Sequence, residues 1–83
     1  MIIVNFPAAL YPLSGQSMIV REPVSTVGEL IQALDRLVPG IARELDDPLY
    51  NLAINDEILL HAVDARALKD GDIVEVIPSM AGG

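Results

Sequence analysis

Residues 68–83 read Leu68-Lys69-Asp70-Gly71-Asp72-Ile73-Val74-Glu75-Val76-Ile77-Pro78-Ser79-Met80-Ala81-Gly82-Gly83. Within this stretch, the segment from Ile73 to Ile77 is rich in Ile and Val, a composition that favours a β-strand. The pair Asp70-Gly71 just before it is typical of a tight turn. We therefore expect a strand over residues 73–77 that follows a turn and carries the end of the chain away from the fold.

The last five residues, 79–83, come after a proline. Pro78 has no backbone N–H to donate to a sheet, so strand pairing is expected to stop there and to leave residues 79–83 as a short arm. The arm ends in Gly82 and Gly83, and residues without a Cβ allow a backbone to enter a narrow channel of another protein. This pattern predicts a terminal carboxylate on which a partner enzyme acts. The alternative is a frayed chain end without a function.

The composition indicates a single domain. The chain has 83 residues, no cysteine and 52% apolar residues, of which only three are aromatic. A core of Ile, Leu, Val and Ala over residues 1–78 must therefore hold by packing, without disulfides. No apolar run approaches the roughly 18 residues of a membrane span, and the opening residues lack the basic region of a signal peptide. We expect a soluble, cytoplasmic protein that does not contact a membrane.

The chain is acidic, with a formal net charge of −7 at pH 7. Such a charge repels a phosphate backbone, so nucleic acid is not expected as a direct ligand. Complementary charge speeds the encounter of two proteins, which favours a basic protein partner. The alternative is that the acidic surface serves solubility alone. The cations are five in number: Arg21, Arg36, Arg43, Arg66 and Lys69.

Two strands are expected near the start of the chain. Ile2-Ile3-Val4 is a continuous apolar run that Pro7 closes, which predicts a strand buried on both faces in the middle of a sheet. Residues 8–15 contain Pro12 and are expected to form an irregular connection. The next strand is expected between Gln16 and Glu22, and a hairpin would place it beside the first.

The clearest helix begins at Thr26. Thr26 and Glu29 form a capping-box pattern, in which the hydroxyl and the carboxylate each accept a hydrogen bond from a free backbone N–H. Pro39-Gly40 ends the helix. Its apolar residues recur at helical spacing and predict one stripe that lies on a sheet: Val27, Leu30, Ile31, Leu34, Leu37 and Val38.

The remaining elements are short. Residues from Ile41 to Leu45 favour one more helical turn, and Leu52-Ala53-Ile54 favours a third strand. Asn55-Asp56-Glu57 is expected to turn the chain into an edge piece, Ile58-Leu59-Leu60. A connection follows, and Leu68 is expected to anchor it to the core.

This order of elements predicts an α+β fold. The first and last strands are the most apolar, and if they pair at the centre they run in parallel, because a crossover through a helix connects parallel strands. One main helix then covers one face of a mixed sheet of four to five strands. This arrangement is a ubiquitin-like β-grasp.

With this order in place, the sequence resembles the ubiquitin-like sulfur carriers of the MoaD/ThiS family over essentially the whole chain. Among them it is most similar to the small subunit of molybdopterin synthase (MoaD type), with the thiamine-pathway carrier (ThiS type) as a close cousin. The resemblance rests on the following segments: Ile2-Ile3-Val4, Thr26-Val27-Gly28-Glu29-Leu30, Ala53-Ile54-Asn55, Leu68-Lys69-Asp70-Gly71-Asp72-Ile73-Val74, Ile77-Pro78 and Gly82-Gly83.

The resemblance implies a carrier and not an enzyme. A ubiquitin-activating-type adenylyltransferase (MoaB/MoeB/ThiF-like) uses ATP to adenylate the carboxylate of Gly83, and sulfur then replaces AMP to give a thiocarboxylate. No cofactor is bound by the carrier itself. Gly82 and Ala81 are the tail residues needed for activation, and Met80, Ser79 and Pro78 are the expected partner contacts.

The sulfur acceptor stays open at this point. The resemblance favours molybdopterin biosynthesis, where the large subunit of the synthase takes up the tail and supplies the catalytic groups. However, Ser79 stands where the family often has a second proline. Thiamine, tRNA thiolation, an amino acid or a secondary metabolite are alternative destinations. A protein modifier joined to lysines through Gly83 and a noncovalent adaptor are further alternatives.

Other chemistry has little support. His61 is the single histidine and there is no cysteine, so a Cys/His metal cluster cannot form. His61 is expected to be a surface or loop residue. Asp70-Gly71-Asp72 lacks the remaining ligands of a calcium loop and is expected to be a turn.

Overall fold

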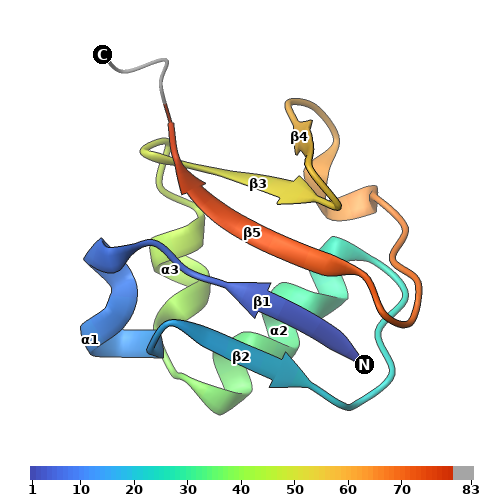
Figure 1. Ribbon diagram of the computed structural model, residues 1–83, viewed down its shortest axis with the longest axis horizontal. Helices are drawn as coiled ribbons and strands as arrows, with labels where there is room; N and C mark the ends of the chain where they lie inside the picture. Colours follow the sequence, from blue (N-terminus) through green and yellow to red (C-terminus); the bar gives the residue numbers. More distant parts are fainter. Residues whose placement is uncertain (80–83) are drawn as a thin grey trace.

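The computed structural model describes residues 1–79, which form a mixed sheet with helices against one of its faces (Figure 1). In chain order the elements are β1 (Ile2–Asn5), the 3₁₀ helix η1 (Ala8–Leu10), α1 (Tyr11–Ser14), β2 (Ser17–Val20), α2 (Val27–Leu37), α3 (Ile41–Leu45), β3 (Tyr50–Ile54), β4 (Glu57–Leu59), the 3₁₀ helix η2 (Val63–Ala65) and β5 (Ile73–Pro78). The strands lie in the order β2-β1-β5-β3-β4.

The last strand lies at the centre of the sheet. β5 pairs in parallel with β1, with Ile3 opposite Ile73, and antiparallel with β3, with Leu52 opposite Val76. β2 pairs antiparallel with β1, as expected for the second strand. The predicted parallel pairing of the two most apolar strands, and with it the β-grasp arrangement, is confirmed.

Burial alternates along β1. Ile2 and Val4 are 2% and 0% exposed, whereas the side chains of Ile3 and Asn5 are half-buried. The expectation that this strand is buried on both faces was wrong, because the helices cover only one face of the sheet (Figure 1). The other face of the sheet is therefore accessible.

Residues 8–15 are more regular than the sequence suggested. They contain η1 and the single-turn helix α1, where we expected an irregular connection. Pro12 is compatible with α1 because it occupies the first turn, where a backbone N–H has no helical partner. A helix of one turn gives too few residues for a periodic signal, so sequence patterning could not detect it.

The main helix begins as predicted. The hydroxyl of Thr26 accepts a hydrogen bond from the N–H of Glu29 (3.2 Å), and the carboxylate of Glu29 accepts one from the N–H of Ser25 (2.7 Å). The buried stripe differs from the predicted one at two positions. Leu37, in the last turn of α2, is 55% exposed, and Ala33 is buried in the stripe.

The core consists of apolar side chains alone within the described residues. Leu68 belongs to it, at 7% exposure, and its N–H donates to the carbonyl of Ser25 (2.9 Å). The expected anchor is therefore confirmed, and it ties the segment before β5 to the start of α2. The least exposed large side chains come from all layers of the fold: Leu30, Leu34, Ile41, Val4, Val20, Val27 and Val74.

Candidate functional site

The sheet ends at the corner where β3 begins and β5 finishes. Pro78 lies opposite Tyr50 in the register, and the N–H of Ser79 donates to the carbonyl of Leu49 (2.6 Å). Backbone pairing thus continues one residue past Pro78, where we expected it to stop. Hydrogen bonds join alternate residues of an antiparallel pair, and Pro78 occupies a position that donates none to β3. Its missing N–H therefore does not interrupt the ladder.

Two of the sequence-predicted site residues lie in this corner, and four do not belong to the described part of the chain. Pro78 is exposed and Ser79 is half-buried. Met80, Ala81, Gly82 and Gly83 lie outside the described residues, so their expected roles and the division into residues 1–78 and 79–83 stay predictions. The structure fixes the point from which residues 80–83 start, beside Leu49.

The face of the sheet away from the helices carries a row of isoleucines. Ile3 on β1 lies opposite Ile19 on β2 and Ile73 on β5, and Ala53 on β3 lies opposite Ile58 on β4. Residues opposite each other in a sheet point to the same face. We call this surface the open sheet face, and its members are Ile3, Asn5, Ser17, Ile19, Asn51, Ala53, Ile58, Ile73, Glu75 and Ile77.

The open sheet face is accessible and largely apolar. Ile19, Ile58 and Ile73 are 47%, 52% and 41% exposed. Large exposed apolar side chains that lie together on one surface are typical of a protein-binding site. This face also includes Ile77 near the end of β5, so a partner seated on it is close to Ser79.

Two polar contacts fix the turn that leads into β5. The carboxylate of Asp72 accepts hydrogen bonds from the N–H of Lys69 (2.8 Å) and from the side-chain amide of Asn55 (3.0 Å). These donors lower the pKa of Asp72. The side-chain oxygen of Asn55 in turn accepts from the N–H of Ile73 (3.0 Å). Asn55 and Asp72 thus join the β3–β4 hairpin to the start of β5.

The backbone of both turns requires unusual conformations. Asn55 and Asp56 have φ values of 48° and 74°, as a two-residue hairpin between β3 and β4 demands. Gly71 has φ of 91°, and its N–H donates to the carbonyl of Met1 (2.7 Å). The expected turn at Asp70-Gly71 is confirmed, and it also holds the start of the chain.

An ion pair lies at the outer edge of the sheet. Arg66 donates to the carboxylate of Glu57 (2.9 Å), which lowers the pKa of Glu57 and raises that of Arg66. His61 is exposed, as expected. Within residues 1–79, no group of three or more His, Cys, Asp or Glu side chains is arranged to hold a metal ion. The same part of the chain has no helix with the length and apolar character to cross a membrane.

Sequence reasoning missed the exposed apolar residues beside Ser79 and on the open sheet face. Leu49 is 61% exposed beside Ser79, and Ile19 and Ile58 belong to the open sheet face. The signal for Ile73 was present in the alternation of the last strand, because Val74 and Val76 are buried and their neighbours face the other way. Ile19 and Ile58 belong to the open sheet face because of the order of the strands in the sheet, and this order cannot be read from the sequence of any one strand.

Comparison with known proteins gives a consistent result. The model of the ThiS family matches residues 4–83. The sulfur carrier protein CysO of Mycobacterium tuberculosis (strain H37Rv) is 32% identical over 91 residues, covering 99% of this chain and 98% of that protein. The crystal structure of M. tuberculosis CysO superposes with a TM-score of 0.82 at 30% identity, covering 96% of this chain and 100% of that one.

A second crystal structure shows a relative bound to another protein. In the BexX/CysO complex of Amycolatopsis orientalis, the matching chain has a TM-score of 0.82 at 27% identity, and all of both chains is covered. These similarities extend over the whole chain, so both the fold and the family are shown. The chain belongs to the ThiS family and is a ubiquitin-like sulfur carrier protein, a carrier and not an enzyme.

Proposed function

We propose that Gly83 carries the sulfur, as a thiocarboxylate on the terminal carboxyl group. An oxygen of the carboxylate attacks the α-phosphate of ATP on a ubiquitin-activating-type adenylyltransferase, which gives an acyl adenylate and releases pyrophosphate. A sulfur nucleophile at the oxidation level of sulfide then attacks the acyl carbon and displaces AMP. The ATP belongs to the partner enzyme, and the carrier is its co-substrate.

The observation that carries this proposal is the anchoring of the sheet at Ser79. The central strand β5 leads to this point, and the bond from Ser79 to Leu49 attaches it to β3. Ser79 precedes Gly83 by four residues, so a partner that binds this corner is within a few residues of the carboxylate. Gly82 and Gly83 have no Cβ, so the partner's channel can be narrow there. The family match includes these residues, since it extends to position 83.

We propose that the activating enzyme binds the open sheet face. The exposed isoleucines of this face provide apolar area, and Ile77 on the same face lies just before the tail. An enzyme docked on this face lies next to Ile77 and so close to Ser79, the last described residue before the tail. The BexX/CysO complex is a precedent for a carrier of this fold bound to a protein partner.

The sulfur acceptor is proposed on the similarity to CysO. The relatives named CysO are 32% identical over nearly the whole chain, whereas a matching molybdopterin-converting factor complex from Helicobacter pylori is 23% identical and shares the fold alone. Among the destinations that the sequence leaves open, amino-acid synthesis is the one that a CysO-type carrier favours. Molybdopterin, together with the large synthase subunit as partner, stays a prediction from the sequence.

The test uses the full chain and the adenylyltransferase from the same cells. Wild-type protein should support ATP–pyrophosphate exchange and gain the mass difference between sulfur and oxygen when a sulfide source is added. Gly82→Val and a variant with one Ala added after Gly83 should remain folded and do neither. A displacement of about 1 Å at the reacting group already lowers the rate roughly 100-fold. Leu37→Ala is the control, because it changes an exposed side chain on the helical side and leaves the tail intact, so it should behave as wild type.

Three outcomes would contradict the proposal. Thiocarboxylation of the extended variant at the wild-type rate would mean that Gly83 is not the reacting end. Conjugates of the chain with lysines of other proteins, without any sulfur gain, would indicate a protein modifier. If removal of Gly82 and Gly83 changed no phenotype of the source cells, a noncovalent adaptor would be the better explanation. Loss of the gene distinguishes the acceptors, since it should create an amino-acid requirement and leave molybdenum enzymes active.

A further inference from the structure

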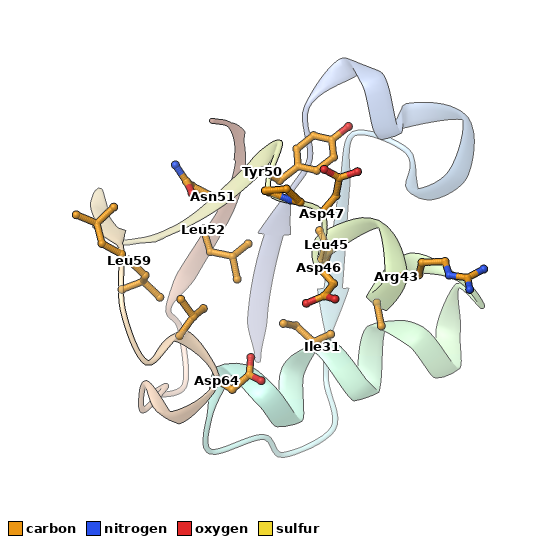
Figure 2. A pocket seen from close by; sticks show the side chains of 14 residues that line it. Ile31, Arg43, Leu45, Asp46, Asp47, Tyr50, Asn51, Leu52, Leu59 and Asp64 are labelled. Atoms are coloured by element: carbon orange, nitrogen blue, oxygen red, sulfur yellow. The ribbon is translucent and has the colours of Figure 1, made fainter. Parts of the chain in front are cut away.

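A groove lies on the helical side of the sheet, away from the open sheet face. It separates the β3–β4 hairpin from α2 and α3, and its volume is about 580 Å³ (Figure 2). Ile31 on α2, Leu52 on β3 and Leu59 on β4 line it together with residues of the segment between α3 and β3. We call this hollow the hairpin groove.

The lining of the hairpin groove contains a continuous set of apolar side chains. Leu52 and Leu59 are buried members of the core, and Ile31, Leu45 and Val63 are half-buried residues that pack against it. Figure 2 shows Leu52, on the hairpin, at one side of the groove, Leu45 at the other side, and Ile31 on α2 at its base. These residues stay partly accessible because the sheet extends to β4 while α2 and α3 cover only its inner part. Apolar side chains of a bound segment could fill this space.

The remaining wall of the groove is acidic. Asp46, Asp47 and Asp64 line it, and Arg43 is the one cation among its lining residues. Figure 2 shows the carboxylates of Asp46 and Asp64 beside Ile31, while the guanidinium of Arg43 extends away from them. None of the three aspartates takes part in an ion pair within residues 1–79. The groove therefore has unneutralised negative charge next to apolar surface.

The groove also adjoins the corner from which the tail starts. Pro48 and Tyr50 line it, and Leu49 between them holds the N–H of Ser79. A protein that takes up the tail is thus beside the groove. The groove and the exposed isoleucines of the open sheet face lie on opposite sides of the sheet, and Asn51 is common to both surfaces. The groove can therefore be occupied while a second protein contacts the isoleucines.

We propose that the hairpin groove binds a basic, amphipathic segment of a protein partner, with apolar side chains against Ile31 and Leu52 and an Arg or Lys between Asp46 and Asp64. The net charge of −7 attracts such a segment and repels nucleic acid. This inference goes beyond the proposed function and does not depend on any chemistry at Gly83. A carrier with this second site can be held by its sulfur-accepting partner through a surface that the activating enzyme leaves free.

The test is a titration of ¹⁵N-labelled full-length protein with a short capped peptide in which Leu and Arg alternate. Saturable shifts are expected at the amides of Ile31, Leu52 and Asp64. Asp46→Asn and Asp64→Asn should each weaken binding roughly two- to fivefold, the range that exposed ion pairs support, and added salt should weaken it as well. Peptides with Glu in place of Arg, or Ser in place of Leu, should bind much more weakly.

Asp56→Asn is the matched control, because it removes the same charge at the tip of the hairpin, outside the groove lining. It should leave the affinity unchanged. An equal loss in Asp56→Asn and Asp64→Asn would mean that the peptide senses net charge alone, and would overturn the proposal. Shifts centred on the open sheet face, or shifts that never saturate, would overturn it too. None of these results depends on whether Gly83 accepts sulfur, so the two proposals can fail separately.

Discussion

The backbone N–H of Ser79 donates a 2.6 Å hydrogen bond to the carbonyl of Leu49, one residue beyond the last registered pair of β3 and β5. This bond extends the pairing of the two segments by one residue. Ser79 precedes Gly83 by four residues in the sequence. A contact between two backbones therefore fixes the position of Ser79, and substitutions that keep its N–H should preserve it.

The first prediction concerns Ser79→Pro. Proline removes the donor, and Pro78 already has the extended conformation that a following proline requires, so the fold should remain. We expect the free energy of unfolding to fall by about 0.5–1.5 kcal/mol, the usual contribution of one hydrogen bond. Urea denaturation measures this free energy of unfolding. Ser79→Ala retains the N–H and is the control; an equal loss in both variants would assign the effect to the side chain.

The second prediction concerns the open sheet face. Ile73→Thr keeps a β-branched residue in the strand but removes apolar area from a side chain that is 41% exposed. Affinity for the activating enzyme should fall about tenfold, which corresponds to 1.4 kcal/mol. The stability should change by less than about 1 kcal/mol. Calorimetric titration and thermal unfolding measure the two quantities.

Leu37→Ala is the comparison for this experiment, because Leu37 is 55% exposed on the helical side. It should not weaken the binding of the activating enzyme. If Leu37→Ala weakened binding as much as Ile73→Thr, the enzyme would approach from the helical side, and the docking proposal would be wrong.

The third prediction is a pH dependence that Asp72 causes. Its pKa is lowered in the folded protein by the Lys69 N–H and the Asn55 amide. The unfolded chain therefore binds a proton more readily, and the contribution of Asp72 to stability is present above the unfolded pKa, about 3.9. It is lost as the pH falls through that value and below it.

Asp72→Asn should accordingly destabilise the protein at pH 6 to 7 more than at pH 2 to 3, roughly the two sides of this titration. Urea denaturation across this range gives the difference between wild type and variant. If Asp72→Asn lowered the free energy of unfolding by the same amount at every pH, the hydrogen bonds of Asp72 would stabilise its protonated and charged forms equally.

The fourth prediction concerns the start of α2. Thr26→Ala removes the hydroxyl that accepts from the N–H of Glu29 and should lower the stability by about 1 kcal/mol. For a domain of this size, the melting temperature should fall by roughly 4–8 °C. Thr26→Ser retains the acceptor and should lie close to wild type. An equal effect of the two substitutions would point to the lost methyl group instead of the cap.

Much of the fold could be predicted from local patterns. The run from Ile73 to Ile77 and the capping pair Thr26 and Glu29 both predicted the elements that form there. The parallel pairing of β1 and β5 also followed, since a helix separates the strands in sequence and both are apolar. These features follow from short stretches of the sequence or from the general rule that a crossover through a helix connects parallel strands.

The site was less accessible to prediction. The exposure of Ile3 depends on the helices leaving one face of the sheet uncovered, and the row from Ile19 to Ile73 requires the strand order. The hairpin groove is assembled from α2, α3, β3, β4 and η2, none of which has an unusual sequence. The bond from Ser79 to Leu49 depends on strand register, which the rule for proline does not specify.

The central position of β5 also affects how the protein is made. β5 lies between β1 and β3 and is the last of the described strands in chain order, so the two halves of the sheet are joined by a strand made after both of them. A nascent chain that ends before Ile73 has neither this join nor a complete open sheet face. The β1–β2 pair and the β3–β4 pair of such a chain lack the strand that joins them, so the complete five-stranded sheet can form only after β5 has been made.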